Sequence, residues 1–134
     1  MDDPKMPLPR DRVVVHAIHP PPLGDEAMTA AMHYWADKNG RPLQGEITMP
    51  PHRARTAMSM AFNALLGAEV CRHGFGWVDI SPQLMDEEGT GIVAKRFRKN
   101  DMADIHLEER ATAPIYAEAY RKGAFGFAGQ CGWP

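Results

Sequence analysis

The sequence contains few of the features from which function is usually inferred. It has only two cysteines, Cys71 and Cys131, which are too few for a disulfide scaffold and lack the close spacing of a metal site. Cys71 is therefore expected to pack as a small apolar side chain. No apolar run is long enough to span a membrane, and the N-terminus lacks the apolar stretch of a signal peptide. We therefore expect a cytoplasmic protein without membrane contact.

An excess of charge of one sign is also lacking. The net charge is −2 over 134 residues, with acidic and basic residues mixed along the chain, whereas non-specific binding to nucleic acids or membranes needs a strong positive bias. Leu, Ile, Val and Phe together make up only about 18% of the chain, below the usual globular level. We therefore expect Ala and Met to fill much of the core and to leave some apolar surface for a protein partner or a second copy.

The six histidines do not show the spacing of a metal site. His16 and His19 are three residues apart, so they would point to opposite faces of a strand. A metal site would need distant segments to bring together residues such as His19, His33 and His106. We expect no metal ion and no cofactor.

One stretch dominates the sequence, residues 57–70 with the sequence AMSMAFNALLGAEV. Only Ser59, Asn63 and Glu69 in it are polar, which is typical of a helix that neighbours cover on several sides. The pair Pro50–Pro51 before it and Gly74 after it are typical helix boundaries. The pattern predicts a long central helix from His52 to His73.

The remaining segments predict an α+β domain. The expected order is β-α-β-α-β-β-α, with a small, mostly antiparallel sheet packed on the central buried helix. The strands are expected over residues 12–19, 45–49, 75–80 and 91–97. Helices are expected from Gly24 or Asp25 to Asn39, over residues 82–88 for a turn or two, and from Asp101 towards Ala111. Pro114 either kinks this last helix or opens another one capped by Thr112.

The chain divides into a single domain and two tails. Residues 1–10 are rich in Pro and charge and are expected to form a flexible N-terminal tail. Residues 11–122 form the α+β domain. Residues 123–134 form a C-terminal tail in which glycine alternates with aromatic residues, and glycine at that density resists regular structure.

Carboxylates after one expected strand form the most enzyme-like group. Asp79 ends the strand, and Glu87 and Glu88 follow in the next turn. Carboxylates at such a place can hold a divalent cation or transfer protons, so a small metal-assisted enzyme with a site near Asp79 and a histidine is one alternative. An acidic turn in contact with water is the simpler interpretation.

Basic residues suggest a second alternative, a module that binds nucleic acid or a phosphate ligand. Four cations flank Phe97, a combination that can hold a phosphate backbone and stack a base. A second group lies at the N-terminus of the central helix, where free N–H groups attract anions. Equally, Phe97 could face the core while the cations protect a strand edge. The candidate residues are His52, Arg53, Arg55, Lys95, Arg96, Arg98 and Lys99.

The leading hypothesis is a small non-catalytic binding or accessory protein that acts through protein–protein contacts. No catalytic group is assembled in the sequence, and the expected core is thin. In size and plainness the chain is similar to the accessory proteins of mobile elements. A protein partner or self-association is expected, with aromatic anchors of the kind that interfaces favour. The anchor candidates are Trp35, Phe125, Phe127 and Trp133.

Overall fold

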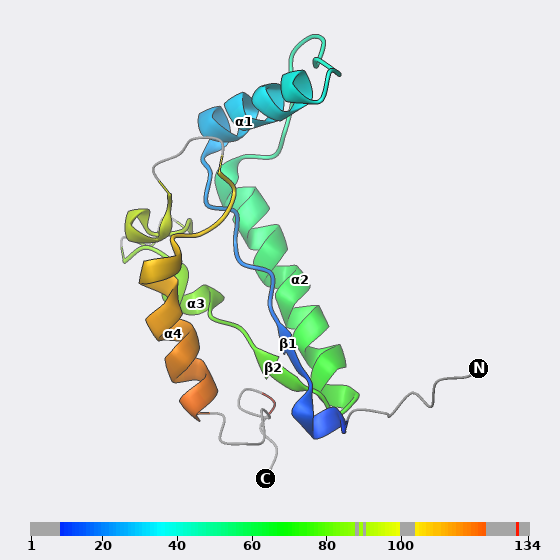
Figure 1. The fold of residues 1–134 in the computed structure, drawn as a ribbon, viewed down its shortest axis with the longest axis vertical. Helices are drawn as coiled ribbons and strands as arrows, with labels where there is room; N and C mark the ends of the chain where they lie inside the picture. Colours follow the sequence, from blue (N-terminus) through cyan, green and yellow to red (C-terminus); the bar gives the residue numbers. More distant parts are fainter. Residues whose placement is uncertain (1–8, 88, 90, 100–103, 123–130, 132–134) are drawn as a thin grey trace, which may run out of the picture.

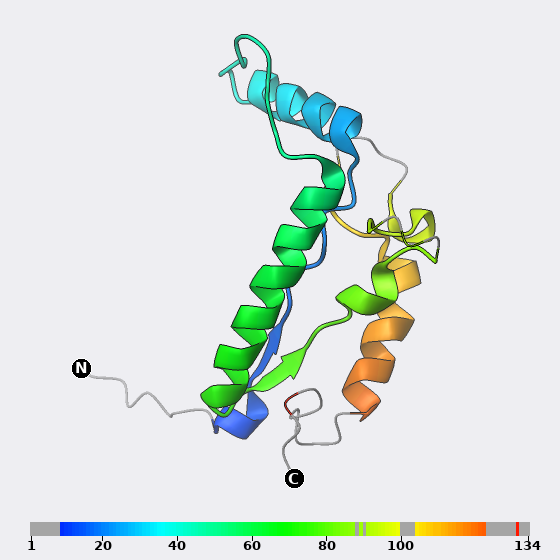
Figure 2. The ribbon, with the colours of Figure 1, turned by 180° about the vertical axis from the view of Figure 1, so that it is seen from behind.

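A computed structural model describes residues 9–87, 89, 91–99, 104–122 and 131 of the chain. Figure 1 shows the long helix α2 (His52–Arg72) along one side of the molecule and α4 (Glu109–Lys122) along the other, with α1 (Asp25–Lys38) beyond the N-terminal end of α2. The strands β1 (Val14–His16) and β2 (Gly76–Val78) lie between α2 and α4, as the view from behind also shows (Figure 2). A 3-10 turn, η1 (Arg10–Arg12), precedes β1.

The two long helices begin and end where the sequence predicts. α1 starts after Gly24, carries Asp25 and Glu26 in its first turn, and is followed by Gly40 with φ +67°. The two carboxylates complement the positive end of the helix dipole. α2 starts after Pro51 and is followed by Gly74 at φ +82°, a conformation that favours glycine. Local end signals were sufficient for both helices.

The predicted sheet is wrong. Within the described residues the strands form a single two-stranded parallel sheet, in which Val14 pairs with Gly76, Val15 with Trp77 and His16 with Val78. The expected order β-α-β-α-β-β-α with a mostly antiparallel sheet is therefore not formed. The physical reason is the long connection through α1 and α2, which is the kind of crossover that parallel strands need.

Two of the expected strands are absent from the described chain. Residues 45–49 belong to no strand. In place of a strand over 91–97, Val93 forms an isolated antiparallel bridge with Met85, and the 3-10 turn η2 (Lys95–Phe97) follows. Gly91 has φ +76°, a left-handed conformation that interrupts an extended strand.

The main apolar core lies away from the outer side of α2. It joins β2, the short helix α3 (Ser81–Leu84), η2 and the inner side of α4. Its buried members are Val78, Ile80, Leu84, Val93, Ala94, Phe97 and Leu107. The expected Ala and Met core is thus incorrect for the described residues: apart from Ala94, the buried members of this core are large aliphatic residues and Phe97, and no Met is among them.

The last helix starts later than predicted. α4 begins at Glu109 and contains Pro114 within its body, so Pro114 does not open it; Asp101 lies outside the described residues. Thr112 does not cap a helix start, since its hydroxyl donates to the carbonyl of Glu108 within the first turn at 3.1 Å. Pro114 removes the N–H that would bond the Arg110 carbonyl, and a proline inside a helix favours a kink, so the predicted kink at this residue stays a prediction.

The cysteines are joined, contrary to the expectation for Cys71. A disulfide links Cys71, next to the C-terminal end of α2, with Cys131. The bond ties residue 131 to the body of the protein across a sequence separation of 60 residues. None of the helices in the described part of the chain combines the length and apolar character that a membrane crossing needs.

Candidate functional site

The side of α2 that faces the rest of the protein contains a buried polar residue, Asn63, and a closely packed glycine, Gly67. Asn63 is 1% exposed, and its side chain accepts from the N–H of Ile18 at 3.0 Å and donates to the Ile18 carbonyl at 2.7 Å. Its amide also donates to the Ser81 hydroxyl at 3.3 Å. Gly67 lies against the indole of Trp77. This side of α2 is therefore held by side-chain hydrogen bonds and one close glycine contact.

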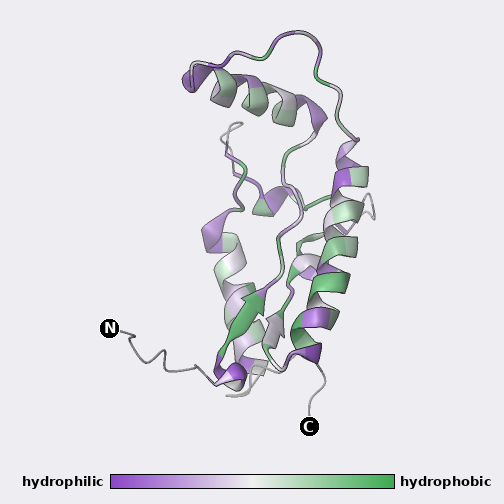
Figure 3. Cartoon of the chain, turned by 90° about the vertical axis from the view of Figure 1, so that its right-hand side faces the viewer, coloured by the Kyte–Doolittle hydropathy of each residue, from purple (hydrophilic) through white to green (hydrophobic). Residues whose placement is uncertain are grey.

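The opposite side of α2 is apolar and open, which contradicts the predicted burial on several sides. We call it the outer face; it consists of Ala54, Ala57, Met58, Ala61, Leu65 and Ala68, all exposed. Leu65 is 72% exposed and Met58 63%. Figure 3 shows the hydrophobic middle of α2 between its hydrophilic ends. The residues recur at helical spacing and therefore form a continuous stripe.

A hollow borders the outer face. It has a volume of about 260 Å³ and is lined by Ile18, Met58, Ser59 and Phe62. Phe62 is 48% exposed and Ile18 is 55% exposed. Single exposed apolar side chains are common, but a contiguous apolar patch such as this one marks a surface that receives another protein. Outer face and hollow together form the candidate site.

A second aromatic group lies on α1. Tyr34 and Trp35 pack edge to face with ring centroids 5.4 Å apart, and the Lys38 ammonium lies 4.8 Å from the Trp35 ring centroid. Trp35 is 45% exposed. Its exposure is compatible with the predicted role as an interface anchor, which stays a prediction.

The basic residues at the start of α2 differ in their surroundings. His52 is 7% exposed and its Nε2–H donates to the carbonyl of Pro21 at 2.7 Å. The Arg55 guanidinium donates to the carbonyl of Leu23 and to Asp25, both at 3.0 Å. Arg53 is exposed. Two of the three predicted anion ligands therefore hold the chain between β1 and α1 against α2.

The basic segment at η2 also makes internal contacts. Arg98 donates to the carbonyl of Val93 at 2.7 Å, and Arg96 lies 3.5 Å from the Glu87 carboxylate. Lys99 pairs with Asp104 at 3.2 Å, and Lys95 is exposed. Phe97 is 2% exposed, so it cannot stack a base without leaving the core.

The structure brings a histidine to the strand end at which the sequence places Asp79. His16 is the last residue of β1 and Asp79 directly follows β2, so both lie at the end of the parallel sheet where the two strands terminate. The His16 ring is hydrogen bonded with the Tyr120 hydroxyl and lies 5.3 Å from the ring of Tyr116. Burial raises the pKa of Tyr116, and the nearby Tyr120 and Asp79 raise it further.

Histidine and tyrosine side chains are both used as general acids and bases, so this group at the end of the sheet has the chemistry for proton transfer. Its other contacts are structural, because an Asp79 oxygen accepts from the N–H of Ser81 at 2.8 Å. Glu87, predicted to act with Asp79, instead pairs with Arg96, and Glu88 lies outside the described residues. The enzyme hypothesis near Asp79 stays a prediction.

The candidate metal ligands do not gather in the part of the chain that can be described. Across those residues, no three His, Cys, Asp or Glu side chains form a group that could hold a metal ion. His19 contacts the carbonyl of Pro20, and His106 contacts Asp104.

The other predicted anchors, Phe125, Phe127 and Trp133, lie outside the described residues. The outer face of α2 was missed as a surface because its apolar residues were assigned to the core. The signal that could have revealed it is Asn63, a polar residue that marks one side of an otherwise apolar helix. Comparisons with models of protein families, with curated proteins and with solved structures found no match to this chain.

Proposed function

We propose that this chain is a small non-catalytic binding protein that works through protein–protein contacts, with the outer face of α2 as its contact surface and a second copy of the chain as the occupant. The single observation that carries the proposal is the exposure of Leu65, at 72%, beside an apolar hollow on the same helix. Burying such a side chain removes apolar surface from water, which favours association.

The outer face is complementary to itself. Leu65 projects from α2, and the hollow at Met58 and Phe62 lies about one to two turns away, roughly 8 Å along the axis. A two-fold axis between them places Leu65 of each copy in the hollow of the other, as an isologous interface requires. The alanines at 54, 57, 61 and 68 let the two antiparallel helices approach closely.

The area of the outer face determines how strongly two copies are expected to associate. From Ala54 to Ala68 the outer face is about 21 Å long and the helix is roughly 10 Å wide. These dimensions give about 200 Å² on each copy, well below a standard interface, so the contact is of the size at which complexes are weak and transient. The low net charge of −2 adds little repulsion between copies. We therefore expect a reversible dimer.

Sedimentation velocity over a wide concentration series tests the proposal. The unaltered protein should shift from monomer to dimer as its concentration rises, and Leu65→Glu should remain monomeric because it would place a charge in the hollow. The matched control is Ile105→Glu, which introduces the same charge at a residue 49% exposed outside α2 and should dimerise normally. A monomer at every concentration, or a dimer that tolerates Leu65→Glu, would contradict the proposed self-association.

We also propose a cytoplasmic location, as expected from the sequence, and the Cys71–Cys131 bond offers its test. Thiols in the cytosol are kept reduced, whereas oxidising compartments maintain disulfides. Rapid alkylation of intact cells should therefore trap two free thiols on this chain. Recovery of the oxidised form alone would rule out the cytoplasm as its steady-state location.

A further inference from the structure

We propose that residues 45–49 and α1 form a docking groove for an extended basic peptide, which adds as a β-strand alongside these residues. This surface is separate from the outer face of α2 and does not depend on the function proposed above. Strand addition joins an extended peptide to free backbone groups and reads its alternate side chains in pockets. Both requirements can be checked against the structure.

The first observation concerns the backbone of residues 45–49, whose sequence GEITM is typical of a strand. Its exposure alternates as in a strand: Glu46 and Thr48 are exposed, and Ile47 and Met49 are half-buried. Yet no backbone N–H or C=O of these five residues is hydrogen bonded to any other residue that the structure describes. A segment with strand character and free backbone groups can pair with an added strand.

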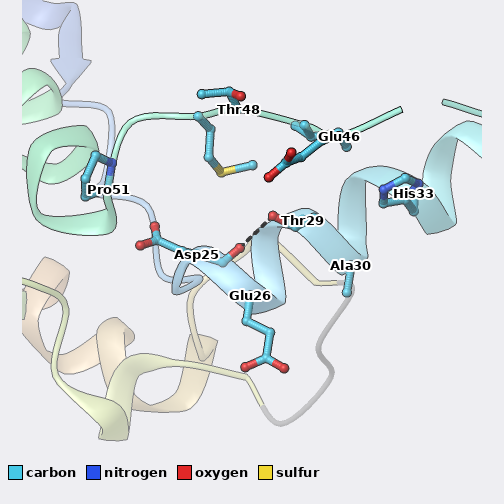
Figure 4. A pocket seen from close by; sticks show the side chains of 10 residues that line it. Asp25, Glu26, Thr29, Ala30, His33, Glu46, Thr48 and Pro51 are labelled. Atoms are coloured by element: carbon cyan, nitrogen blue, oxygen red, sulfur yellow. Dashed lines mark hydrogen bonds between the residues drawn. The ribbon is translucent and has the colours of Figure 1, made fainter. Parts of the chain in front are cut away.

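The second observation is an open cavity of about 560 Å³ beside this segment. Figure 4 shows residues 46–49 running along α1, with the cavity between the two. Thr29, Ala30 and His33 line it from α1, and residues 46–49 all line it from the segment. The volume is in the range of ligand-binding clefts, so it has room for side chains of an added strand.

The charge around the groove selects a basic occupant. Of the described residues that line the cavity, three are carboxylates and none is a lysine or an arginine. Asp25 already pairs with Arg55 at 3.0 Å, and Figure 4 shows the Glu26 carboxylate directed away from the segment. The Glu46 carboxylate turns into the space between the segment and α1 (Figure 4). Glu46 is therefore the expected partner of a lysine or arginine on the peptide.

A second copy of the chain is a poorer occupant of this groove. The matching segment of another copy would bring only Glu46 as a charge, which repels the same carboxylates. A peptide with one basic residue among apolar residues satisfies the backbone, the apolar lining and Glu46 together.

A phage-displayed library of random hexapeptides, panned on the full chain, tests the proposal. Enriched peptides should share a lysine or arginine at one fixed position, since Glu46 is the carboxylate left to bind it. Glu46→Gln should weaken their binding about tenfold, equivalent to roughly 1.4 kcal/mol. Gln44→Lys, which makes the same change in charge at an exposed residue outside the cavity lining, should change it less than about twofold by the same measure.

The backbone pairing has its own signature. Successive N–H groups of a paired strand point to opposite edges, so N-methylation of alternate residues in an enriched peptide should abolish binding in one register and be tolerated in the other. Amide exchange of residues 46–48 should slow when the peptide binds. No enrichment over a blank surface, equal sensitivity in both N-methyl registers, or self-pairing of the chain through residues 45–49 would overturn the proposal.

Discussion

At the scale of single residues, two positions on α2 decide which side of the helix faces inward. The Asn63 side chain supplies hydrogen-bond partners for both the N–H and the C=O of Ile18, which belongs to no strand. A buried backbone group without a hydrogen-bond partner would lower the stability of the fold. Gly67 lets the Trp77 indole approach the helix.

Gly67→Ala should destabilise the fold, although alanine is the better helix former by about 1 kcal/mol. An added Cβ would lie 2.7 Å from the Trp77 ring, so the buried indole must shift. Overpacking of this kind costs about 1–3 kcal/mol, which outweighs the gain in helix propensity. Urea unfolding followed by tryptophan fluorescence measures the difference.

The control for this prediction is Ala68→Gly on the exposed side of α2. It should cost about 1 kcal/mol through helix propensity alone. If Gly67→Ala proves as stable as the unaltered protein or more so, the close packing of Gly67 on Trp77 is not a feature of the molecule in solution.

At the scale of elements, charged side chains reinforce the backbone pairing between η2 and the start of α4, where Arg98 bridges Leu107 and the Glu108 N–H donates to the carbonyl of Phe97. Asp104 accepts from the N–H of His106 at 2.8 Å and from the His106 ring at 2.7 Å, and it pairs with Lys99 at 3.2 Å. These contacts, the His106 N–H first, lower the pKa of Asp104 to about 2. Lys99 also reaches the Glu109 carboxylate at 3.5 Å, at the start of α4.

The lowered pKa predicts the direction of a pH dependence. In the unfolded chain Asp104 has the ordinary aspartate pKa of about 3.9. Because its pKa is lower in the folded protein, ionised Asp104 stabilises the fold at pH values above about 3.9. The stabilisation is lost as the pH falls through the folded-state pKa. Asp104→Asn should therefore reduce stability at pH 6, with the difference from the unaltered protein shrinking between about pH 4 and pH 2.

Urea unfolding at several pH values measures this effect, and NMR titration of Asp104 supplies a second readout. Lys99→Met should move the pKa of Asp104 only part of the way back, because the contacts with His106 remain. A stability difference that stays constant from pH 6 to pH 2 would exclude the proposed link.

At the scale of the whole molecule, the core and the disulfide lie in different places. The main core joins β2, α3, η2 and α4, whereas the disulfide lies at the C-terminal end of α2. In the oxidised protein, the bond compensates for a small core by restricting the unfolded chain. In a reducing compartment both thiols are free, and the core alone stabilises the fold.

Cys131→Ser should lower the free energy of unfolding by about 4 kcal/mol, since the disulfide closes a long loop in the unfolded state. The sequence separation of 60 residues sets this size. Unfolding curves with and without a thiol reductant measure it: reductant should destabilise the unaltered protein and leave Cys131→Ser unchanged. Equal stability of the two proteins under oxidising conditions would show that the bond is not formed in solution.

The boundaries of α1 and α2 could be predicted from local sequence patterns. The ends of α1 lie next to Gly24 and Gly40, and those of α2 lie next to Pro51 and Gly74. These ends could be predicted because capping depends only on nearby residues. The sheet could not be predicted in this way. Residues 45–49 have the pattern of a strand but no partner in the described chain, and pairing depends on which distant segment lies alongside.

The sequence by itself determined the positions of α1 and α2, since their caps and spacing are local properties of the chain. Only the tertiary structure decided the parallel pairing of β1 with β2, the joining of Cys71 to Cys131, and the exposure of Leu65. Each of these depends on contacts between residues far apart in sequence. The identity of an apolar residue on a helix does not show whether the fold will bury it or leave it exposed to a partner.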